Sequence, residues 1–235
     1  MSTALSPRVR TTPDPAGDCL AILLAGGRGS RLYELTADEC KPAIPFGTGR
    51  IVDYVLSNVA EARLPRLMVA TQYRPETLVR HLAGWAPRFA GGLTVRDGHE
   101  VTGTAAGYLG TADAVLRNLE EIDALAPKEV LVLSADHVYR MDLAAMIEAH
   151  RASGVAATVA VTAVPRREGR AFGIATTDRE GRVTAFDEKP DFPAPMPGRP
   201  DLALASMGIY VFDWAWLRAA LLDDALITGG PLQAE

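Results

Sequence analysis

The chain has 235 residues, enough for one large α/β domain, and a hydrophobic content of 48% can supply a substantial core. Its 24 basic and 29 acidic residues give a formal net charge of −5, and the absence of a Lys/Arg-rich block argues against a nucleic-acid partner. No apolar run approaches the roughly 18 residues of a membrane span, so we expect a soluble, cytoplasmic protein with no membrane partner.

Cys19 and Cys40 are the only cysteines. Their spacing is not that of a disulfide framework, and no apolar h-region follows a basic N-terminus, so we expect reduced thiols over the alternative of one disulfide. Residues 1–18 hold three prolines and a glycine among small polar residues, a composition that predicts a flexible N-terminal tail before a domain over residues 19–235.

Strand and helix patterns alternate over the first part of the domain. Short apolar, β-branched runs predict buried parallel strands at 20–25, 67–71 and 129–136. Helical spacing of apolar residues predicts helices at 53–63, after Pro75, at 114–122 and at 143–153, the last with Asp142 as cap and Gly154 at its end.

After residue 155 the order changes to mostly strands. Alternating patterns predict strands at 157–164, 173–177, 182–186 and 207–212, with a turn at 178–181 and a helix at 214–222. Residues 190–200 contain five prolines and predict a surface loop. Together the elements predict an α/β fold with a mainly parallel sheet extended by antiparallel strands and with helices on both faces.

A glycine-rich segment follows the first predicted strand. Gly26, Gly27 and Gly29 surround Arg28 at the carboxyl end of this strand, where open α/β sheets bind ligands. Glycines let a phosphate approach the backbone N–H groups closely. The segment lacks the Lys-Ser/Thr pair of a P-loop and the third glycine of the dinucleotide fingerprint, which disfavours both of those classes.

Basic residues near these glycines are suited to binding a polyanionic ligand. Arg28, Arg31 and Lys41 could neutralise the charge of a nucleoside triphosphate. The alternative is an ordinary turn from strand to helix with solvated cations.

Asp136 follows another apolar strand and is expected at the same edge of the sheet. A carboxylate there could hold Mg²⁺ against bound phosphates, because that ion commonly takes one or two carboxylates together with substrate oxygens. A residue that caps the next turn is the alternative. We expect His137 to be packed or hydrogen-bonded instead of binding a metal, since no second His or Cys lies at ligand spacing.

Seven blocks follow one another in the order seen in bacterial ADP-glucose pyrophosphorylase (glucose-1-phosphate adenylyltransferase), and the resemblance runs from about residue 20 to residue 222. The blocks are LAGGRGSRLYELTADECKPAIPFG, RIVDYVLSN, TQYRPETLVRHL, GTADAVLRNL, VLVLSADHVYRMD, FDEKP and ASMGIYVFD. The resemblance implies a Rossmann-like (GT-A-like) nucleotidyltransferase fold that converts ATP and α-D-glucose 1-phosphate to ADP-glucose and diphosphate in glycogen synthesis.

The resemblance also implies roles for individual residues. Arg31 and Lys41 would hold the triphosphate and the developing pyrophosphate, and Asp136 would hold Mg²⁺. The nucleotide would be surrounded by Gly26, Gly27, Arg28, Gly29, Gln72, Tyr108, Gly110, Thr111 and Asp113. Glucose 1-phosphate would contact Glu188, Lys189 and Ser206, although Lys189 could be a surface lysine and Ser206 and Gln72 could be ordinary polar packing.

The sequence departs from the family pattern at several positions. It ends at Glu235, before the DVGT aspartate that gives relatives a second metal contact and before their β-helix domain, so we expect residues 19–235 to be an incomplete domain. GYLGTAD replaces a WYxGTAD pattern, and Tyr33 stands where many relatives carry an allosteric lysine. The family is homotetrameric. A related transferase for another sugar phosphate or nucleotide, and a non-catalytic nucleotide-binding module, are the alternatives.

Overall fold

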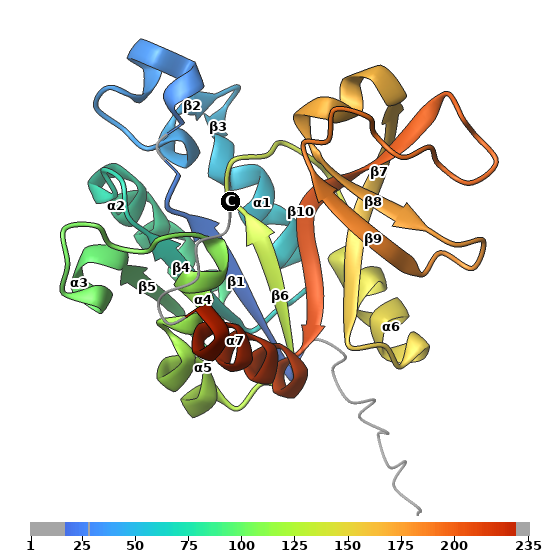
Figure 1. The fold of residues 1–235 in the computed structure, drawn as a ribbon. Coiled ribbons are helices and arrows are strands. Elements are labelled where there is room, and N and C mark those ends of the chain that lie inside the picture. The colour runs from blue at the N-terminus through green and yellow to red at the C-terminus, as the bar shows by residue number, and fades with distance from the viewer. Residues whose placement is uncertain (1–16, 28, 229–235) are drawn as a thin grey trace, which may run out of the picture.

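The computed structural model describes residues 17–27 and 29–228, built around a twisted sheet (Figure 1). Four parallel strands form one half of this sheet in the order β5-β4-β1-β6. Their bounds are β1 (Cys19–Ala25), β4 (Arg66–Thr71), β5 (Leu93–Asp97) and β6 (Glu129–Ser134). Strand β1 lies between β4 and β6, and its apolar residues are buried on both faces, as a continuous hydrophobic run predicts.

The other half of the sheet is antiparallel. Strand β10 (Leu202–Asp213) pairs with β7 along one side, and on its other side with β8 near its start and with β6 near its end. The remaining strands are β7 (Ala157–Pro165), β8 (Gly173–Thr177) and β9 (Val183–Glu188), with a separate β2 (Pro45–Phe46) and β3 (Gly49–Arg50) hairpin. The register of β10 against β7 shifts between Ser206 and Tyr210, where Gly208 adopts a positive φ of 66°. The predicted mainly parallel sheet with antiparallel additions is therefore confirmed.

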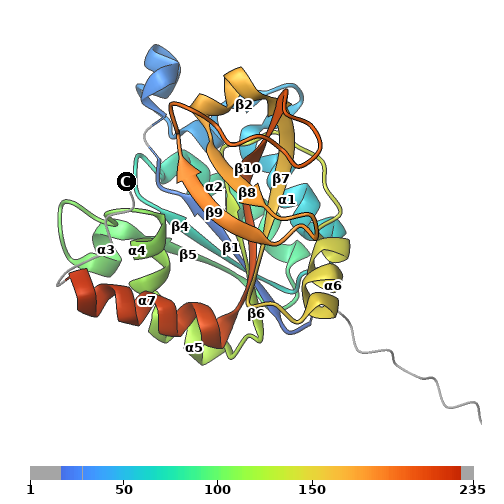
Figure 2. The same ribbon diagram turned by 45° about the vertical axis from the view of Figure 1, so that its right-hand side comes forward.

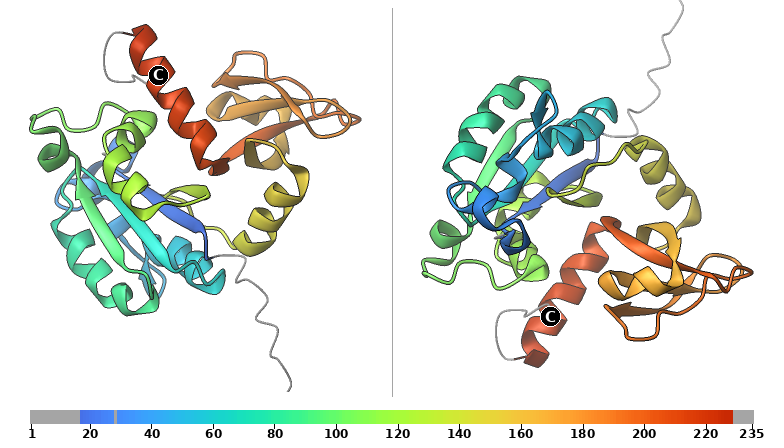
Figure 3. Two further views of the ribbon diagram at one scale, coloured as in Figure 1. Left: turned by 90° about the horizontal axis from the view of Figure 1, so that it is seen from below. Right: turned by 90° about the horizontal axis from the view of Figure 1, so that it is seen from above.

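Helices cover both faces of the sheet, as predicted. Residues of α1 (Ile51–Glu61), α2 (Glu76–Trp85) and α6 (Leu143–Ser153) share one buried apolar cluster with β1. Residues of α4 (Thr111–Leu116), α5 (Leu119–Leu125) and α7 (Trp214–Thr228) form a second cluster on the opposite face. Figure 2 shows α7 running along this second face beside α4, which it contacts, and Figure 3 shows α7 from below and from above.

Short segments complete the chain. They are α3 (Gly98–Thr102) and the 3₁₀ turns η1 (Ser30–Thr36), η2 (Lys41–Ala43), η3 (Ala86–Arg88) and η4 (Arg166–Ala171). The ends of α6 are those predicted, because Asp142 Oδ1 accepts a hydrogen bond from the Ala145 N–H at 2.9 Å and Gly154 takes a φ of 62°. Residues 190–200 contain no helix or strand, only an isolated bridge between Met196 and Arg199.

Several element boundaries differ from the sequence prediction. The helix predicted at 114–122 is broken into α4 and α5, because the Asn118 side chain bonds Ala114 O and the Tyr108 hydroxyl while its own backbone leaves helical geometry (φ −107°, ψ 15°). Strand β6 ends two residues early, β10 begins five residues early and α7 runs on to residue 228. Strand β5 was not predicted.

Both cysteines are free and fully buried, as predicted for reduced thiols. Burial, with a further contribution from the charge of Glu129, raises the pKa of Cys19 to about 12. Of the predicted tail, residues 1–16 lie outside the described residues. Among those that are described, no helix combines the length and the apolar character needed to cross a bilayer.

Candidate active site

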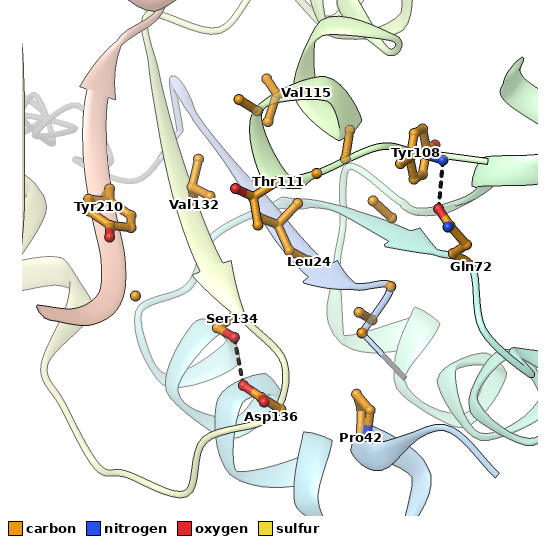
Figure 4. Close-up of a pocket in the computed structure, with 18 of the residues that line it drawn as sticks. Leu24, Pro42, Gln72, Tyr108, Thr111, Val115, Val132, Ser134, Asp136 and Tyr210 are labelled. Atoms are coloured by element: carbon orange, nitrogen blue, oxygen red, sulfur yellow. Dashed lines mark hydrogen bonds between the residues drawn. The ribbon is translucent and has the colours of Figure 1, made fainter. Parts of the chain in front are cut away.

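A cavity of about 610 Å³ opens at the carboxyl ends of β1, β4 and β6 (Figure 4). Its polar part is lined by the glycine segment, Lys41, Gln72, Ser134, Asp136 and His137, and one wall by residues 108–112. Its apolar part comes from side chains of β1, β6, β10, α4 and α7. Segments far apart in sequence thus meet at the edge where doubly wound sheets bind ligands.

The glycine segment lines the cavity directly. Gly26, Gly27 and Gly29 all border it. Gly29 has a φ of 63°, and a Cβ at this position would lie 2.9 Å from Lys41 Cβ, so both conformation and space require glycine. Arg28 lies outside the described residues, as does the side chain of Arg31, whose backbone belongs to η1.

Lys41 and Asp136 form an ion pair at the cavity. Lys41 Nζ donates to Asp136 Oδ2 at 2.8 Å, and the Ser134 hydroxyl donates to Oδ1 at 2.7 Å. Burial acts to raise the pKa of Asp136, but the hydrogen bonds from Lys41 and Ser134 outweigh it and hold that pKa below its ordinary value. Asp136 is therefore an ionised carboxylate at neutral pH, oriented at both oxygens.

His137 also borders the cavity, half exposed. Its Nδ1 donates to Met207 O at 3.0 Å, in line with the predicted hydrogen-bonded role, while Nε2 lies 3.5 Å from Asp136 Oδ1. Ser134 and His137 were not assigned to the site from the sequence. The signal for Ser134 was its position two residues before Asp136 at the end of the same strand.

Gln72 holds the wall of the cavity. Its Oε1 accepts from the Tyr108 N–H at 2.6 Å and its Nε2 donates to Ala106 O at 2.9 Å (Figure 4). Burial raises the pKa of Tyr108. Gly110 and Thr111 border the cavity beside Tyr108.

Asp113 does not border the cavity, and its expected contact with the nucleotide stays a prediction. Its side chain is completely buried and accepts from the Leu109 N–H at 2.9 Å and from Arg117 Nε at 3.2 Å. A buried carboxylate requires such partners, because desolvation is costly.

The residues expected to bind glucose 1-phosphate lie outside the lining of this cavity. Glu188 ends β9 and pairs with Lys189, which has a φ of 45° and donates its N–H to Phe172 O at 3.1 Å. The Ser206 hydroxyl lies 2.9 Å from that of Tyr210, a cavity residue, so Ser206 stands one hydrogen bond behind the lining.

Comparisons with known proteins agree with this architecture. The sequence profile described as nucleotidyl transferase matches residues 20–225. Glucose-1-phosphate adenylyltransferases of Jannaschia sp. and of Vibrio cholerae are each 46% identical to the chain over 89% of its length. The matched region covers 51% of the Jannaschia protein and 53% of the Vibrio protein. Glucose-1-phosphate adenylyltransferase 1 of Alkalilimnicola ehrlichii is 45% identical, and the match covers 88% of this chain and 50% of that protein.

The chain spans about half the length of the curated relatives it matches. A crystal structure from Bacillus anthracis, described as a glucose-1-phosphate thymidylyltransferase in complex with a sucrose, shares the fold with a TM-score of 0.66 and 21% identity, covering 83% of this chain and 71% of that one. Sequence profile and fold agree, and the chain belongs to the nucleotidyl transferase family.

Proposed function

We propose that this chain carries the nucleotide-binding part of a glucose-1-phosphate adenylyltransferase, which converts ATP and α-D-glucose 1-phosphate to ADP-glucose and diphosphate. The observation that carries the proposal is the meeting of Gly26–Gly27, Lys41 and Asp136 at one cavity, in a chain 43–46% identical to proteins of that name. A role in glycogen synthesis and a cytoplasmic location are part of the proposal.

The proposed chemistry needs positioning and charge more than covalent catalysis. A sugar phosphate oxygen attacks the α-phosphorus of ATP in line, and pyrophosphate leaves. Backbone N–H groups of the glycine segment would bind phosphate oxygens. Lys41, already directed into the cavity, would stabilise the charge that develops on pyrophosphate, with Arg28 and Arg31 as further proposed cations.

Asp136 fits a Mg²⁺ ligand because it offers a hard, ionised oxygen at the cavity, held in orientation by Ser134. The ion, when bound, neutralises charge on the phosphates. Within residues 17–27 and 29–228, no group of three or more His, Cys, Asp or Glu side chains is placed to share a metal. This single carboxylate is what favours the second candidate, a nucleotide-binding module without turnover of its own.

Lys189, Glu188 and Ser206 are proposed to bind the sugar phosphate. The left-handed backbone at Lys189 supports this proposal, because such strain in a non-glycine residue is concentrated at functional positions.

Pyrophosphate release tests the proposal. The purified chain is incubated with Mg²⁺, glucose 1-phosphate and ATP, GTP, UTP or dTTP in turn. We expect release with ATP far above release with the other triphosphates. Preference for another triphosphate would indicate a different nucleotidyltransferase, and ATP binding without release would indicate the binding module.

A further inference from the structure

Asp113 is a buried carboxylate used to hold a loop. Its side chain has no exposed surface, and it lies in the first turn of α4, behind the cavity wall. Burial of a carboxylate is unfavourable unless hydrogen bonds compensate for lost water. Here the compensation comes from the Leu109 N–H at 2.9 Å and from the half-exposed Arg117 at 3.2 Å.

The loop held in this way forms the cavity wall. Three side chains from different parts of the chain fix it in place. Gln72 holds the backbone at Ala106 and Tyr108, and the Asn118 amide donates to the Tyr108 hydroxyl at 2.8 Å. Asp113 is the third anchor, and residues 110–112, which follow its attachment point, border the cavity.

The position of Leu109 explains why this anchor matters. Gly110 offers no side chain to cap α4, and the Asp113 side chain reaches back past it to accept from the N–H of Leu109, which precedes the helix. Without it, the backbone between the Tyr108 anchor and α4 would lose its only side-chain attachment found in the described residues.

We propose that Asp113 is a positioning residue for the nucleotide: it fixes residues 109–111 so that the wall is formed before the triphosphate binds, and it does not touch the ligand. This inference rests on the proposed function, since it assigns that wall to ATP. It predicts an effect on ATP binding with little effect on the sugar phosphate.

The test compares Asp113→Asn and Asp113→Ala with Arg117→Ala in the 235-residue chain. Asp113→Asn keeps the volume and weakens the acceptor, so it remains informative if Asp113→Ala fails to fold. For Asp113→Asn, calorimetric titration should show the Kd for MgATP raised about tenfold, and that for glucose 1-phosphate changed less than about twofold. Arg117→Ala leaves the Leu109 bond in place and should leave MgATP affinity within about threefold of the parent.

Hydrogen exchange of the nucleotide-free chain supplies a readout that does not depend on the reaction. In Asp113→Asn the peptide covering residues 107–112 should exchange about tenfold faster, with β1 and β6 unchanged. Unchanged exchange in that peptide, equal loss of affinity for both substrates, or an equal effect of Arg117→Ala would overturn the inference. A parent chain that binds no ATP would overturn the proposed function and the nucleotide assignment of the wall, whereas exchange would still decide whether Asp113 holds the loop.

Discussion

Lys41 and Asp136 are 95 positions apart in the sequence and 2.8 Å apart in space. In the absence of a ligand, each supplies the other's counter-ion at the cavity. When ligands bind, phosphates could pair with Lys41 and a cation could pair with Asp136, so that neither charge is left unpaired. The pair therefore keeps two charged groups in position at little cost before the substrates arrive.

Replacement of Asp136 by Ala tests its proposed metal role. We expect kcat to fall about 100-fold or more, because an ion that stabilises charge on the phosphates contributes several kcal/mol. The side chain is about one-third exposed at the cavity, so Tm should change little. Steady-state pyrophosphate release and a thermal melt measure both quantities.

Asp38→Ala is the matched control, because Asp38 is 94% exposed and does not border the cavity. An Asp136→Ala enzyme with the parent's turnover would remove this carboxylate from the mechanism.

Lys189→Gln addresses the proposed sugar-phosphate site. Loss of one charge-assisted hydrogen bond, about 1.5–3 kcal/mol, should raise the KM for glucose 1-phosphate roughly 10- to 150-fold and leave the KM for ATP nearly unchanged. Lys128→Gln removes another exposed lysine that is paired with an acidic residue, Asp18, and serves as the control. Equal effects on both substrates would argue against the assignment.

At the scale of elements, Asp53 joins α1 to α2. Its carboxylate accepts from the Arg50 N–H at 2.7 Å, from His81 Nε2 at 2.5 Å and from Trp85 Nε1 at 2.8 Å. Burial acts to raise the pKa of Asp53, yet the hydrogen bonds from these three donors prevail and lower it. Two of the helices that cover one face of the sheet thus share an ionised acceptor.

Asp53→Asn should lower the free energy of unfolding at pH 7 by about 1–3 kcal/mol, because two side-chain donors are left with a neutral, weaker acceptor. A folded-state pKa below the unfolded value, roughly 3.9, means that the stabilisation is present above about pH 4 and is lost as pH falls through the lowered folded-state pKa. Urea unfolding at pH 7 and pH 3 measures this difference between variant and parent.

Glu61→Gln changes a more exposed carboxylate of the same helix and should have little effect at either pH. A destabilisation by Asp53→Asn that is as large at pH 3 as at pH 7 would contradict the ionic origin.

The sequence predicts elements well where local signals agree with burial. Strand β1 is predicted by its apolar run, and helix α6 is predicted by the capping residue at each of its ends. Strand β5 was missed because its five residues, Leu93–Asp97, alternate weakly and are all only partly buried. The division of α4 from α5 was missed because Asn118 breaks the helix through a contact with Tyr108, which helical spacing cannot reveal.

The same distinction applies to the site. Glycine, lysine and aspartate at strand ends could be assigned to one edge from topology alone. Whether a side chain faces the cavity depends on packing between elements, so the sequence could not show that Asp113 is buried outside the cavity lining.

At the scale of the whole molecule, the cavity draws on both halves of the sheet and on α7. A ligand bound there should stabilise the fold, because it binds only when these elements are assembled. At 100 times its Kd, MgATP should add about 2.7 kcal/mol and raise Tm by about 5–10 °C in a chain of this size.

Thermal melts with MgATP, with ATP plus a chelator and with MgUTP measure this effect. We expect the shift to shrink when the metal is removed and to be smaller with MgUTP. Equal shifts with all three ligands would show binding through general anion attraction and not through a nucleotide site.

The buried Cys19 and Cys40 have a practical consequence for such experiments. They are the only two thiols of the chain, and both are buried. The raised pKa of Cys19 also keeps its thiol protonated, and the protonated thiol does not react with thiol reagents as the thiolate does. A cysteine substituted at Leu109, which borders the cavity and is 39% exposed, should therefore take up a maleimide fluorophore alone, without prior deletion of the native pair. Emission from that dye would follow nucleotide entry in real time.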